Sequence, residues 1–482
     1  MKSKASTPKS ISLKASLIPV LLLVVLLAYN VFVFGDDALS GTIQFIVLIC
    51  GAIAAVVGFY HKVSYEKMLA EVAENLKSTT GALLILLMVG ALSGTWLVSG
   101  IIPAMIYYGL QILNPTIFLA ACVIICAIIS IATGSSWTTS ATVGIALIGI
   151  GNALGIPMGM TAGAVLSGAY FGDKMSPLSD TTNLAPAMAG GDLFTHIRYM
   201  LLTTVPTLIV TLIVFVVLGF TMDTSGEADT ASILNSIDAT FNISGWLFLV
   251  PLGVILMILK KTPPLIALLI GTLLGGVFAL IFQPEIIAGL SGAKELNFEN
   301  GYKGILNAIT VSTEIATDNV ALNDLFTSKG MSGMLGTIWL IMCAMVFGGI
   351  MDGIGALSKI SETLLGMAKT TFGLFASTVA SCLALNVTAS DQYLAIVIPG
   401  KMFSKAYKDK GLAPENLSRT LEDSGTVTSV LIPWNTCGAY HSGVLGVGVA
   451  DYFVYAIFNW LSPFMTLLFA AFQIKIAQLK KD

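Results

Sequence analysis

The chain alternates between long apolar runs and short polar interruptions along almost its whole length. Apolar stretches broken by Gly, Pro, Ser and Asp lie between the runs, as is typical of discontinuous membrane helices. The pattern predicts an all-α polytopic membrane protein with about 11–13 transmembrane segments. Ten runs have the length of most or all of a spanning helix: 17–34, 42–60, 83–98, 116–131, 199–220, 246–259, 265–282, 337–350, 372–385 and 452–472.

Composition supports this interpretation. Hydrophobic residues make up 56% of the 482 positions and charged residues 11%, whereas a typical soluble protein has about 25% charged residues. The 24 basic and 27 acidic residues give a net charge of −3, which offers no basic surface for a nucleic acid. The expected surroundings are therefore a lipid bilayer and small solutes. With no soluble domain and no catalytic motif, we expect a secondary transporter and not an enzyme.

The cysteines and histidines indicate no redox or metal chemistry. The cysteines lie in or beside apolar runs without paired spacing, so we interpret them as small core residues. The three histidines are too scattered to suggest a metal cluster. We expect no cofactor and no transition metal. The residues are Cys50, Cys122, Cys126, Cys343, Cys382, Cys437, His61, His196 and His441.

Lysine and arginine mark the cytoplasmic side of a membrane protein. By this rule the segments 1–16, 61–77, 260–261, 401–419 and the tail after 475 lie inside, while the acidic segments 221–244 and 283–335 lie outside. Both termini are then cytoplasmic. The first apolar run is longer than the core of a cleaved signal peptide, about 7–15 residues, so it is interpreted as a retained helix.

The two halves of the chain resemble each other with opposite sidedness. Residues 133–137 correspond to 388–392, 255 positions later. The first half starts inside and ends outside, and the second does the reverse, which is typical of the inverted-topology repeats of secondary transporters. Chance similarity between apolar sequences is the alternative. The predicted organisation is a tail (1–16), a first repeat (17–220), an external linker (221–244), a second repeat (245–475) and a tail (476–482).

Two polar interruptions stand out in the first half. Residues 133–142 hold seven hydroxyls and a glycine between apolar runs, so they offer oxygen ligands such as those of Ser135 and Ser136. Residues 172–183 hold Asp173, Lys174, Asp180 and a helix-breaking proline. A carboxylate within a membrane is costly unless it is paired, protonated or bound to a cation, so it is a candidate for function.

Two counterparts lie in the second half. Residues 386–393 place Asp391 beside two hydroxyl residues, and residues 421–438 contain Glu422, Asp423, a Ser-Gly-Thr sequence and Pro433. We interpret Glu422 as a solvated charge at the cytoplasmic edge and Asp423 as the better ligand candidate.

These motifs favour a site for sodium, a hard cation that takes oxygen ligands. A buried aspartate that binds either a proton or a sodium ion would couple their movements. Lys174 would compensate charge, by neutralising the empty site or by pairing with Asp173 or Asp180, and the sequence leaves this open. The predicted ion- and proton-binding residues are Asp173, Asp180, Asp391 and Asp423, with supporting oxygens from Ser135, Ser136, Thr181, Thr182, Asn183, Thr388, Ser390, Asn435 and Thr436.

At these motifs the chain resembles the NhaC-type sodium/proton antiporter family. The strings that carry the resemblance are TGSSWTT (133–139), GAYFGDKMSPLSDTTNLA (168–185), DQYLAIVIPGKMF (391–403) and LEDSG with IPWNTCGA (421–439). The resemblance implies an ion-transporter-superfamily fold, ion exchange and a location in the cytoplasmic (inner) membrane. The same family includes members that exchange malate and lactate, so the resemblance leaves the substrate open.

The expected function is therefore export of sodium, with lithium as a further candidate cation, in exchange for protons by alternating access. The alternative is a proton- and sodium-coupled organic-acid exchanger. An anion would need basic groups or helix N-termini, and among the core motifs only Lys174 is basic. The oligomeric state stays open, with a homodimer among the candidates.

Overall fold

The computed structural model describes residues 11–34, 41–222, 230–317, 323 and 326–479. Several charges used to predict sidedness lie outside the described residues. These are Lys2, Lys4, Lys9, Asp223, Glu227, Asp229, Lys480 and Lys481.

The protein is all-α, as predicted, apart from one small antiparallel pair of strands, β1 (Thr313–Glu314) and β2 (Thr327–Ser328), in the described ranges. By length and composition, eight described helices can cross a membrane, or nine if a pair bent by 87° counts as one span. The long apolar helices are α1 (Leu13–Phe34), α2 (Thr42–Tyr60), α3 (Tyr65–Val98), α5 (Pro115–Thr133), α10 (Leu193–Thr221), α13 (Pro264–Phe282), α18 (Leu335–Gly353, preceded by α17, Gly330–Gly333) and α20 (Thr371–Thr388).

The predicted 11–13 crossings exceed this count because helices beside the polar interruptions are short or carry charges. These interrupted elements are α6 (Ser136–Thr139), η2 (Ser140–Gly144), α7 (Ile145–Ala153), α8 (Met158–Met175), α9 (Asp180–Ala189), α21 (Gln392–Asp409), α22 (Pro414–Leu421), η5 (Glu422–Thr426), η6 (Ser429–Leu431), α23 (Thr436–Leu445), α24 (Val449–Tyr452) and α25 (Ile457–Ala471). The remaining helices are α4 (Ile101–Ile112), α11 (Thr230–Thr240), η4 (Gly245–Phe248), α12 (Leu249–Leu259), α14 (Pro284–Leu290), α15 (Phe298–Thr310) and α19 (Ala356–Gly366).

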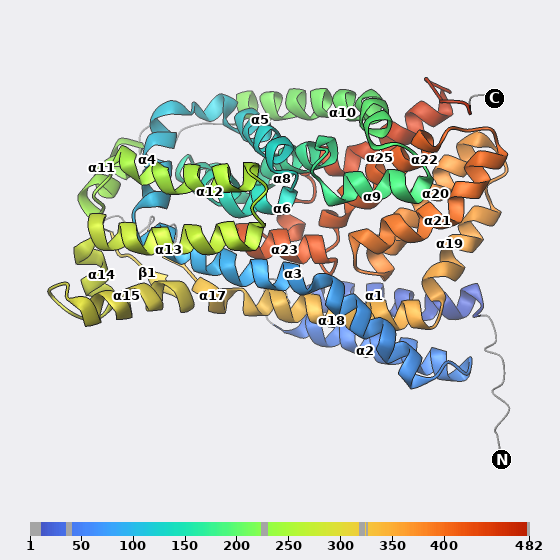
Figure 1. Cartoon of the computed structure of the whole chain (residues 1–482), viewed down its shortest axis with the longest axis horizontal. Coiled ribbons are helices and arrows are strands. Elements are labelled where there is room, and N and C mark those ends of the chain that lie inside the picture. Colours follow the sequence, from blue (N-terminus) through green and yellow to red (C-terminus); the bar gives the residue numbers. More distant parts are fainter. Residues whose placement is uncertain (1–10, 35–40, 223–229, 318–322, 324–325, 480–482) are drawn as a thin grey trace, which may run out of the picture.

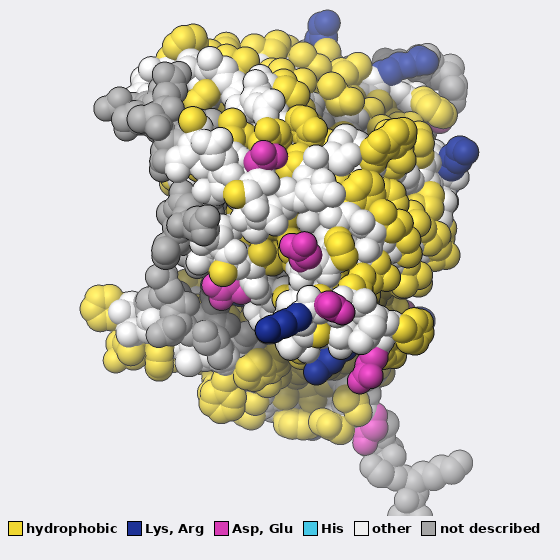
Figure 2. Space-filling model, turned by 90° about the vertical axis from the view of Figure 1, so that its left-hand side faces the viewer, with side chains coloured by type: hydrophobic (Ala, Val, Ile, Leu, Met, Phe, Trp, Pro, Cys, Tyr) yellow, Lys and Arg dark blue, Asp and Glu magenta, His cyan; other side chains and the backbone are white. Residues whose placement is uncertain are grey.

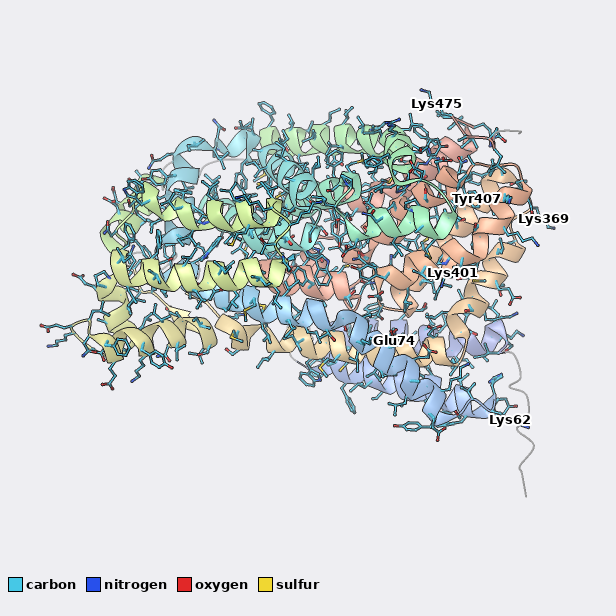
Figure 3. The ribbon with its side chains drawn as sticks, in the orientation of Figure 1. Lys62, Glu74, Lys369, Lys401, Tyr407 and Lys475 are labelled. Atoms are coloured by element: carbon cyan, nitrogen blue, oxygen red, sulfur yellow. The ribbon has the colours of Figure 1, made fainter. Side chains whose placement is uncertain are left out.

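The two ends of the long axis differ in charge. Helices α11, α14 and α15, from the predicted external segments, lie at the left end in Figure 1, and Figure 2 shows acidic side chains with a few basic ones beside them on that end. Lys62, Lys369, Lys401 and Lys475 lie on the right-hand half (Figure 3). These segments, predicted to lie on opposite sides of the membrane, therefore lie toward opposite ends of the molecule. This placement agrees with the basic-inside pattern. The predicted inside segment 260–261 is an exception, because the α12–α13 turn lies near the middle of the long axis (Figure 1).

The order of elements recurs along the chain at a spacing close to the predicted one. The first residues of α5 and α20, Pro115 and Thr371, are 256 positions apart, and so are Asp180 and Thr436, which begin α9 and α23. Left-handed backbone recurs at the same spacing, at Gly134 and Ser390. These spacings fit a register of 256 residues, one more than predicted, which would pair Asp391 with Ser135 rather than Ser136. The opposite membrane orientation of the two halves remains a prediction.

Close packing of α8 against α5 positions the first polar interruption. A Cβ atom at Gly168 would lie 2.2 Å from the carbonyl oxygen of Val123, and one at Gly172 would lie 2.5 Å from that of Ala127. Only glycine permits backbones to approach this closely, as is common where membrane helices pack. This contact places the last turn of α8, which carries Asp173 and Lys174, directly beside the end of α5.

Candidate functional site

A cavity of about 560 Å³ lies where the helix interruptions meet. Its walls come from the α5–α6 break, the α8–α9 break, the α20–α21 break, the start of α23, the middle of α3 and the α12–α13 turn. Three of the four predicted aspartates line it. The polar lining residues are Ser78, Thr79, Thr133, Ser135, Trp137, Thr138, Asp173, Ser179, Asp180, Thr181, Lys261, Thr262, Asp391, Gln392, Tyr393 and Thr436.

The break between α5 and α6 brings a hydroxyl to Asp173. Gly134, with φ of 71°, ends α5, and the Ser135 side chain caps α6 by accepting from the backbone N–H of Thr138 at 3.2 Å. Ser136 then donates both its hydroxyl, at 2.7 Å, and its backbone N–H, at 3.2 Å, to Oδ2 of Asp173. Asp173 is 8% exposed and faces the cavity, so its carboxylate is held in place without a fixed positive charge against it.

The break between α20 and α21 presents Asp391. Ser390 has φ of 60°, and Asp391 caps α21: its Oδ1 accepts from the backbone N–H groups of Tyr393 at 2.9 Å and Leu394 at 3.1 Å. Thr436, at the start of α23, donates its hydroxyl to Oδ2 of Asp391 at 3.5 Å. The Ser390 carbonyl accepts from the backbone N–H of Thr436, which joins this break to α23.

The break between α8 and α9 exposes Asp180 to solvent and closes the end of α8. Thr182 donates its hydroxyl to the carbonyl oxygens of Asp173 and Lys174, at 3.1 and 3.0 Å, so it satisfies orphan groups at the helix end. Asn183 is exposed and donates to the carbonyls of Pro177 and Ser179. Asp180 therefore lies at a solvent-exposed edge of the cavity, and Thr182 and Asn183 contribute to its framework.

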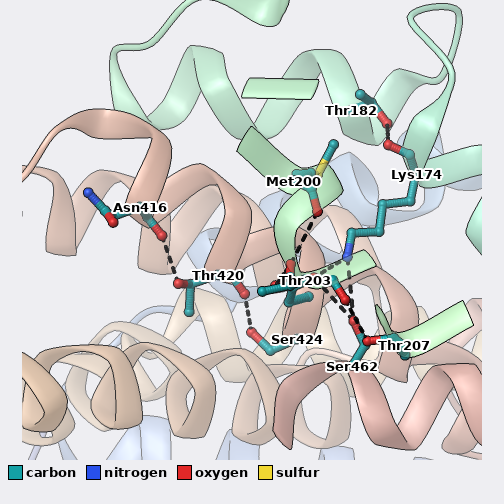
Figure 4. Close-up of polar contacts among 10 residues, drawn as sticks. Lys174, Thr182, Met200, Thr203, Thr207, Asn416, Thr420, Ser424 and Ser462 are labelled. Carbon is teal, nitrogen blue, oxygen red and sulfur yellow. Dashed lines mark hydrogen bonds and ion pairs between the residues drawn. The ribbon is translucent and has the colours of Figure 1, made fainter. Parts of the chain in front are cut away.

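Lys174 points to the opposite side of α8 and forms a buried ion pair with Asp423 of η5. Oδ2 of Asp423 also accepts from the Thr203 hydroxyl of α10 at 2.9 Å, and Oδ1 accepts from the Ser462 hydroxyl of α25 at 3.1 Å. Figure 4 shows the lysine amid these groups. Lys174 and Asp423 are both fully buried, and neither is among the residues that line the cavity. The partner of Lys174, left open by the sequence, is thus neither Asp173 nor Asp180.

Two charges expected at the cytoplasmic edge are instead buried. Glu422 and Arg419 are both 0% exposed, so the interpretation of Glu422 as a solvated charge was wrong. In the part of the chain that the structure describes, neither side chain has a hydrogen-bond partner. The Arg419 guanidinium lies over the Tyr199 ring, 4.5 Å from its centroid. In the sequence both residues lie beside basic loops. The sequence therefore does not reveal that α22 packs against α10, α20 and α21.

The predicted supporting oxygens divide into two groups. Ser135, Thr181 and Thr436 line the cavity. The others hold the framework: for example, Thr388 donates to the carbonyl of Ala384, and the Asn435 amide donates to the carbonyl of Asn386. The other predicted residues that do not line it are Ser136, Thr182, Asn183 and Ser390.

Part of the cavity wall comes from a turn that was not predicted to belong to the site. Lys261 follows α12 with φ of 65° and precedes Pro263 and Pro264, which also line the wall. A lysine pair closely followed by a proline pair marks a tight turn. No pattern in the neighbouring sequence reveals that this turn lines the same cavity as Asp391. The six cysteines are buried and free, as the core interpretation expects.

Comparisons with known proteins agree with the sequence resemblance. A model of the Na+/H+ antiporter family matches residues 168–474. The chain is 38% identical to the Na+/H+ antiporter NhaC of Alkalihalophilus pseudofirmus over 431 residues, which cover 89% of this chain and 90% of that protein. It is 35% identical to NhaC of Bacillus subtilis, over 82% of this chain and 85% of that one. It is also 36% identical to the malate-2H+/Na+-lactate antiporter of Bacillus subtilis, over 91% and 89%.

The family match spans more than half of the chain, and the relatives align along most of their own length. The likeness is therefore not confined to one motif, and the family match includes the polar interruptions at 172–183, 386–393 and 421–438. The chain belongs to the Na+/H+ antiporter family, and is a secondary transporter rather than an enzyme.

Proposed function

We propose that this protein exports Na+ in exchange for H+ across the cytoplasmic membrane, with Li+ as a second cation, and that both termini are cytoplasmic. The observation that carries the proposal is the convergence of Asp173, Asp180 and Asp391 on one cavity at three helix breaks. The names of the family and of its relatives supply the pair of ions.

The chemistry of the cavity fits a small hard cation, which prefers oxygen ligands. Short hydrogen bonds go mainly to one oxygen of each buried carboxylate: Oδ2 of Asp173 and Oδ1 of Asp391. The second oxygens of Asp173 and Asp391 would bind Na+, with hydroxyl oxygens of Ser135, Thr181 and Thr436 as further ligands. Asp180, at the exposed edge, would attract the cation toward the buried pair.

Proton coupling follows from competition for the same carboxylates. Burial favours the neutral form of a carboxyl, whereas a bound cation favours the charged form. A site that holds either a proton or Na+, but not both, exchanges one for the other as it faces each side in turn. Lys174 and Asp423 would serve as a neutral, structural pair beside this site, since neither lines the cavity.

Alternating access would use the interrupted helices. Helices α6, α9, α21 and α23 all begin at the cavity wall, and α9 and α21 lie to the right of α6 and α23 in Figure 1. In secondary transporters, repeats that meet at such breaks rock around a fixed site. The recurring order of elements would supply the two moving parts.

Organic-acid exchange is the second candidate function, and one feature of the cavity favours it. A volume of about 560 Å³ is large for a bare cation. Helix N-termini, which favour anions, also line the wall. A relative over most of the chain is named a malate-2H+/Na+-lactate antiporter.

Purified protein in proteoliposomes with a preset proton gradient separates the two functions. A pulse of Na+ or Li+ should move protons and change the signal of a pH dye, whereas K+ and malate should not. The proposal fails if Na+ moves no protons at any pH from about 6 to 9, near the range in which a desolvated carboxyl titrates. A response that requires malate would establish the second function instead.

A further inference from the structure

One wall of the cavity is an aromatic stack. Trp137 of α6 lines the cavity, and its ring stacks on that of Tyr440 of α23, with centroids 4.0 Å apart and an interplanar angle of 19°. The Tyr440 hydroxyl donates to the Trp137 carbonyl at 3.2 Å. The stack therefore bridges one helix from each half of the chain.

His441 lies directly behind this stack. Its side chain is fully buried, and neither ring nitrogen has a hydrogen-bond partner in the described structure. Its ring centroid is 5.2 Å from that of Tyr440, 5.4 Å from that of Tyr170 and 6.3 Å from that of Trp137. A neutral imidazole carries one donor and one acceptor, so this position lacks two partners.

Three more buried polar atoms without partners belong to this region. Among the described residues these are the Ser140 hydroxyl of η2, an element packed on α23, and the Tyr170 hydroxyl of α8 and indole N–H of Trp137, which have only the Cys437 thiol, a weak acceptor, beside them. Buried polar groups are nearly always hydrogen-bonded to protein or to ordered water. Five poorly satisfied polar atoms on four side chains of neighbouring elements therefore mark a compartment that takes a ligand with both donors and acceptors. None of these side chains is an acid, a lysine or an arginine, so the ligand that fits them is water.

The compartment lies deeper than the cavity along the same helices. Ser135, the cap of α6, and Thr436, the first residue of α23, both line the cavity. Ser140 and His441 each lie five residues beyond them, about 8 Å along a helix that rises 1.5 Å per residue. The exposed lining residues Asp180 and Lys261 belong to other elements, the α8–α9 break and the α12–α13 turn. Along α6, Trp137 at the cavity wall thus lies between the cavity and Ser140, and Tyr440 of α23 packs over the Trp137 ring.

We propose that the compartment around His441 is a water-binding segment of the transport path, and that the Trp137–Tyr440 stack closes it off from the ion cavity in this conformation. The path role rests on the proposed transport function, whereas the barrier can be tested without it. Opening the stack would join the two polar regions into one continuous route. Simple aromatic packing, the competing explanation, makes no use of the unmet polar groups.

Replacing His441 tests whether the polar compartment takes part in transport. His441→Phe fills the site without hydrogen-bonding groups, whereas His441→Gln keeps a donor and an acceptor. In proteoliposomes, Na+-driven proton flux should fall about tenfold in the Phe variant and stay within about threefold of wild type in the Gln variant. Equal flux in the two variants, whether high or low, would overturn the path role. Absence of flux in the wild type would instead overturn the proposed function, and with it the path role.

Thiol labelling tests the barrier directly, because the six native cysteines are buried. We would introduce Ser140→Cys and measure its reaction with a membrane-impermeant methanethiosulfonate, alone and combined with Tyr440→Ala or Tyr440→Phe. Ser361→Cys is the matched control, since Ser361 is equally buried on α19 and its hydroxyl also lacks a partner among the described residues.

The expected result is slow labelling of Cys at position 140 in the parent and with Tyr440→Phe, which keeps the ring, and labelling about tenfold faster with Tyr440→Ala. Position 361 should stay slow in all backgrounds. The barrier is overturned if position 140 already labels fast in the parent, or if Tyr440→Ala leaves its rate within about threefold. A parallel rise at position 361 would also overturn it, because the fold as a whole would have loosened.

Discussion

The two helix breaks that correspond at a spacing of 256 residues share a backbone but differ in chemistry. In the first half, Gly134 adopts left-handed backbone and a neutral Ser135 caps the next helix. In the second half, Ser390 adopts the same backbone and Asp391 forms the cap. The first break acquires its carboxylate from another helix, because Ser136 holds Asp173 of α8.

Both breaks place a carboxylate at the cavity. In the second half it belongs to the break itself, whereas in the first half it comes from a neighbouring helix, α8. The cap at the second break uses one carboxylate oxygen for the helix and leaves the other for the cavity. At the first break, the serine cap and the acidic ligand are separate residues. Substitutions at the two breaks should therefore have unequal effects on transport and on stability.

Neutralising the cavity carboxylates should have the largest effect. Asp391→Asn keeps a helix cap, since asparagine caps as well as aspartate, but removes the charge that faces the cation. Loss of a desolvated charged ligand costs about 2–5 kcal/mol, so Na+-driven proton flux should fall about 30-fold or more. Asp173→Asn should do the same, as measured in proteoliposomes. Wild-type flux in either variant would remove that residue from the site.

Breaking the Lys174–Asp423 pair should cost stability. Lys174→Met leaves Asp423 buried without its cation, and removal of one partner of a buried pair costs about 3–5 kcal/mol. The double variant Lys174→Met/Asp423→Leu should recover most of this loss, as measured by thermal unfolding in detergent. If Asp423→Leu alone were as stable as wild type, the pair would have no structural role.

The two left-handed residues should respond unequally to substitution. Gly134→Ala adds a Cβ atom 2.7 Å from the carbonyl carbon of Leu178 and imposes left-handed strain, so we expect a loss of about 2–3 kcal/mol. Ser390→Gly relieves strain but adds chain entropy, and the two effects nearly cancel, to within about 1 kcal/mol. Thermal unfolding of both variants measures the contrast. If Ser390→Gly lost as much stability as Gly134→Ala, the backbone at Ser390 would carry no strain for glycine to relieve. The two breaks would then not be conformationally equivalent.

The smallest effect concerns the caps farther along each half, Asp192 at α10 and Gly448 at α24. Hydrogen bonds from the backbone and side chain of Thr195 lower the pKa of the Asp192 carboxyl. Because the folded pKa is lowered, the cap stabilises at neutral pH, and this contribution is lost as the pH falls through that pKa. Asp192→Asn should remove the pH dependence and keep the cap. A thermal-unfolding profile against pH that is unchanged in Asp192→Asn would contradict this.

Local patterns were sufficient to predict the class of fold, the helix breaks and the acidic residues at them. Hydrophobic run length and a carboxylate next to Gly, Ser or Pro are signals carried within about ten residues. The direction in which neighbouring side chains point was not predictable: Asp173 faces the cavity, whereas its neighbour Lys174 faces Asp423. The same limit hid the burial of Glu422 and the approach of Lys261, since both depend on contacts between distant helices.

Direct binding of radioactive Na+ to the purified protein tests the central claim most directly. The wild type and Glu362→Gln, which changes an exposed glutamate of α19 that pairs only at the surface with Lys359, should bind Na+ alike. Asp173→Asn and Asp391→Asn should each lose saturable binding while eluting as folded protein. Wild-type affinity in both aspartate variants would contradict the account, because the cation would then be bound elsewhere than at the convergent helix breaks.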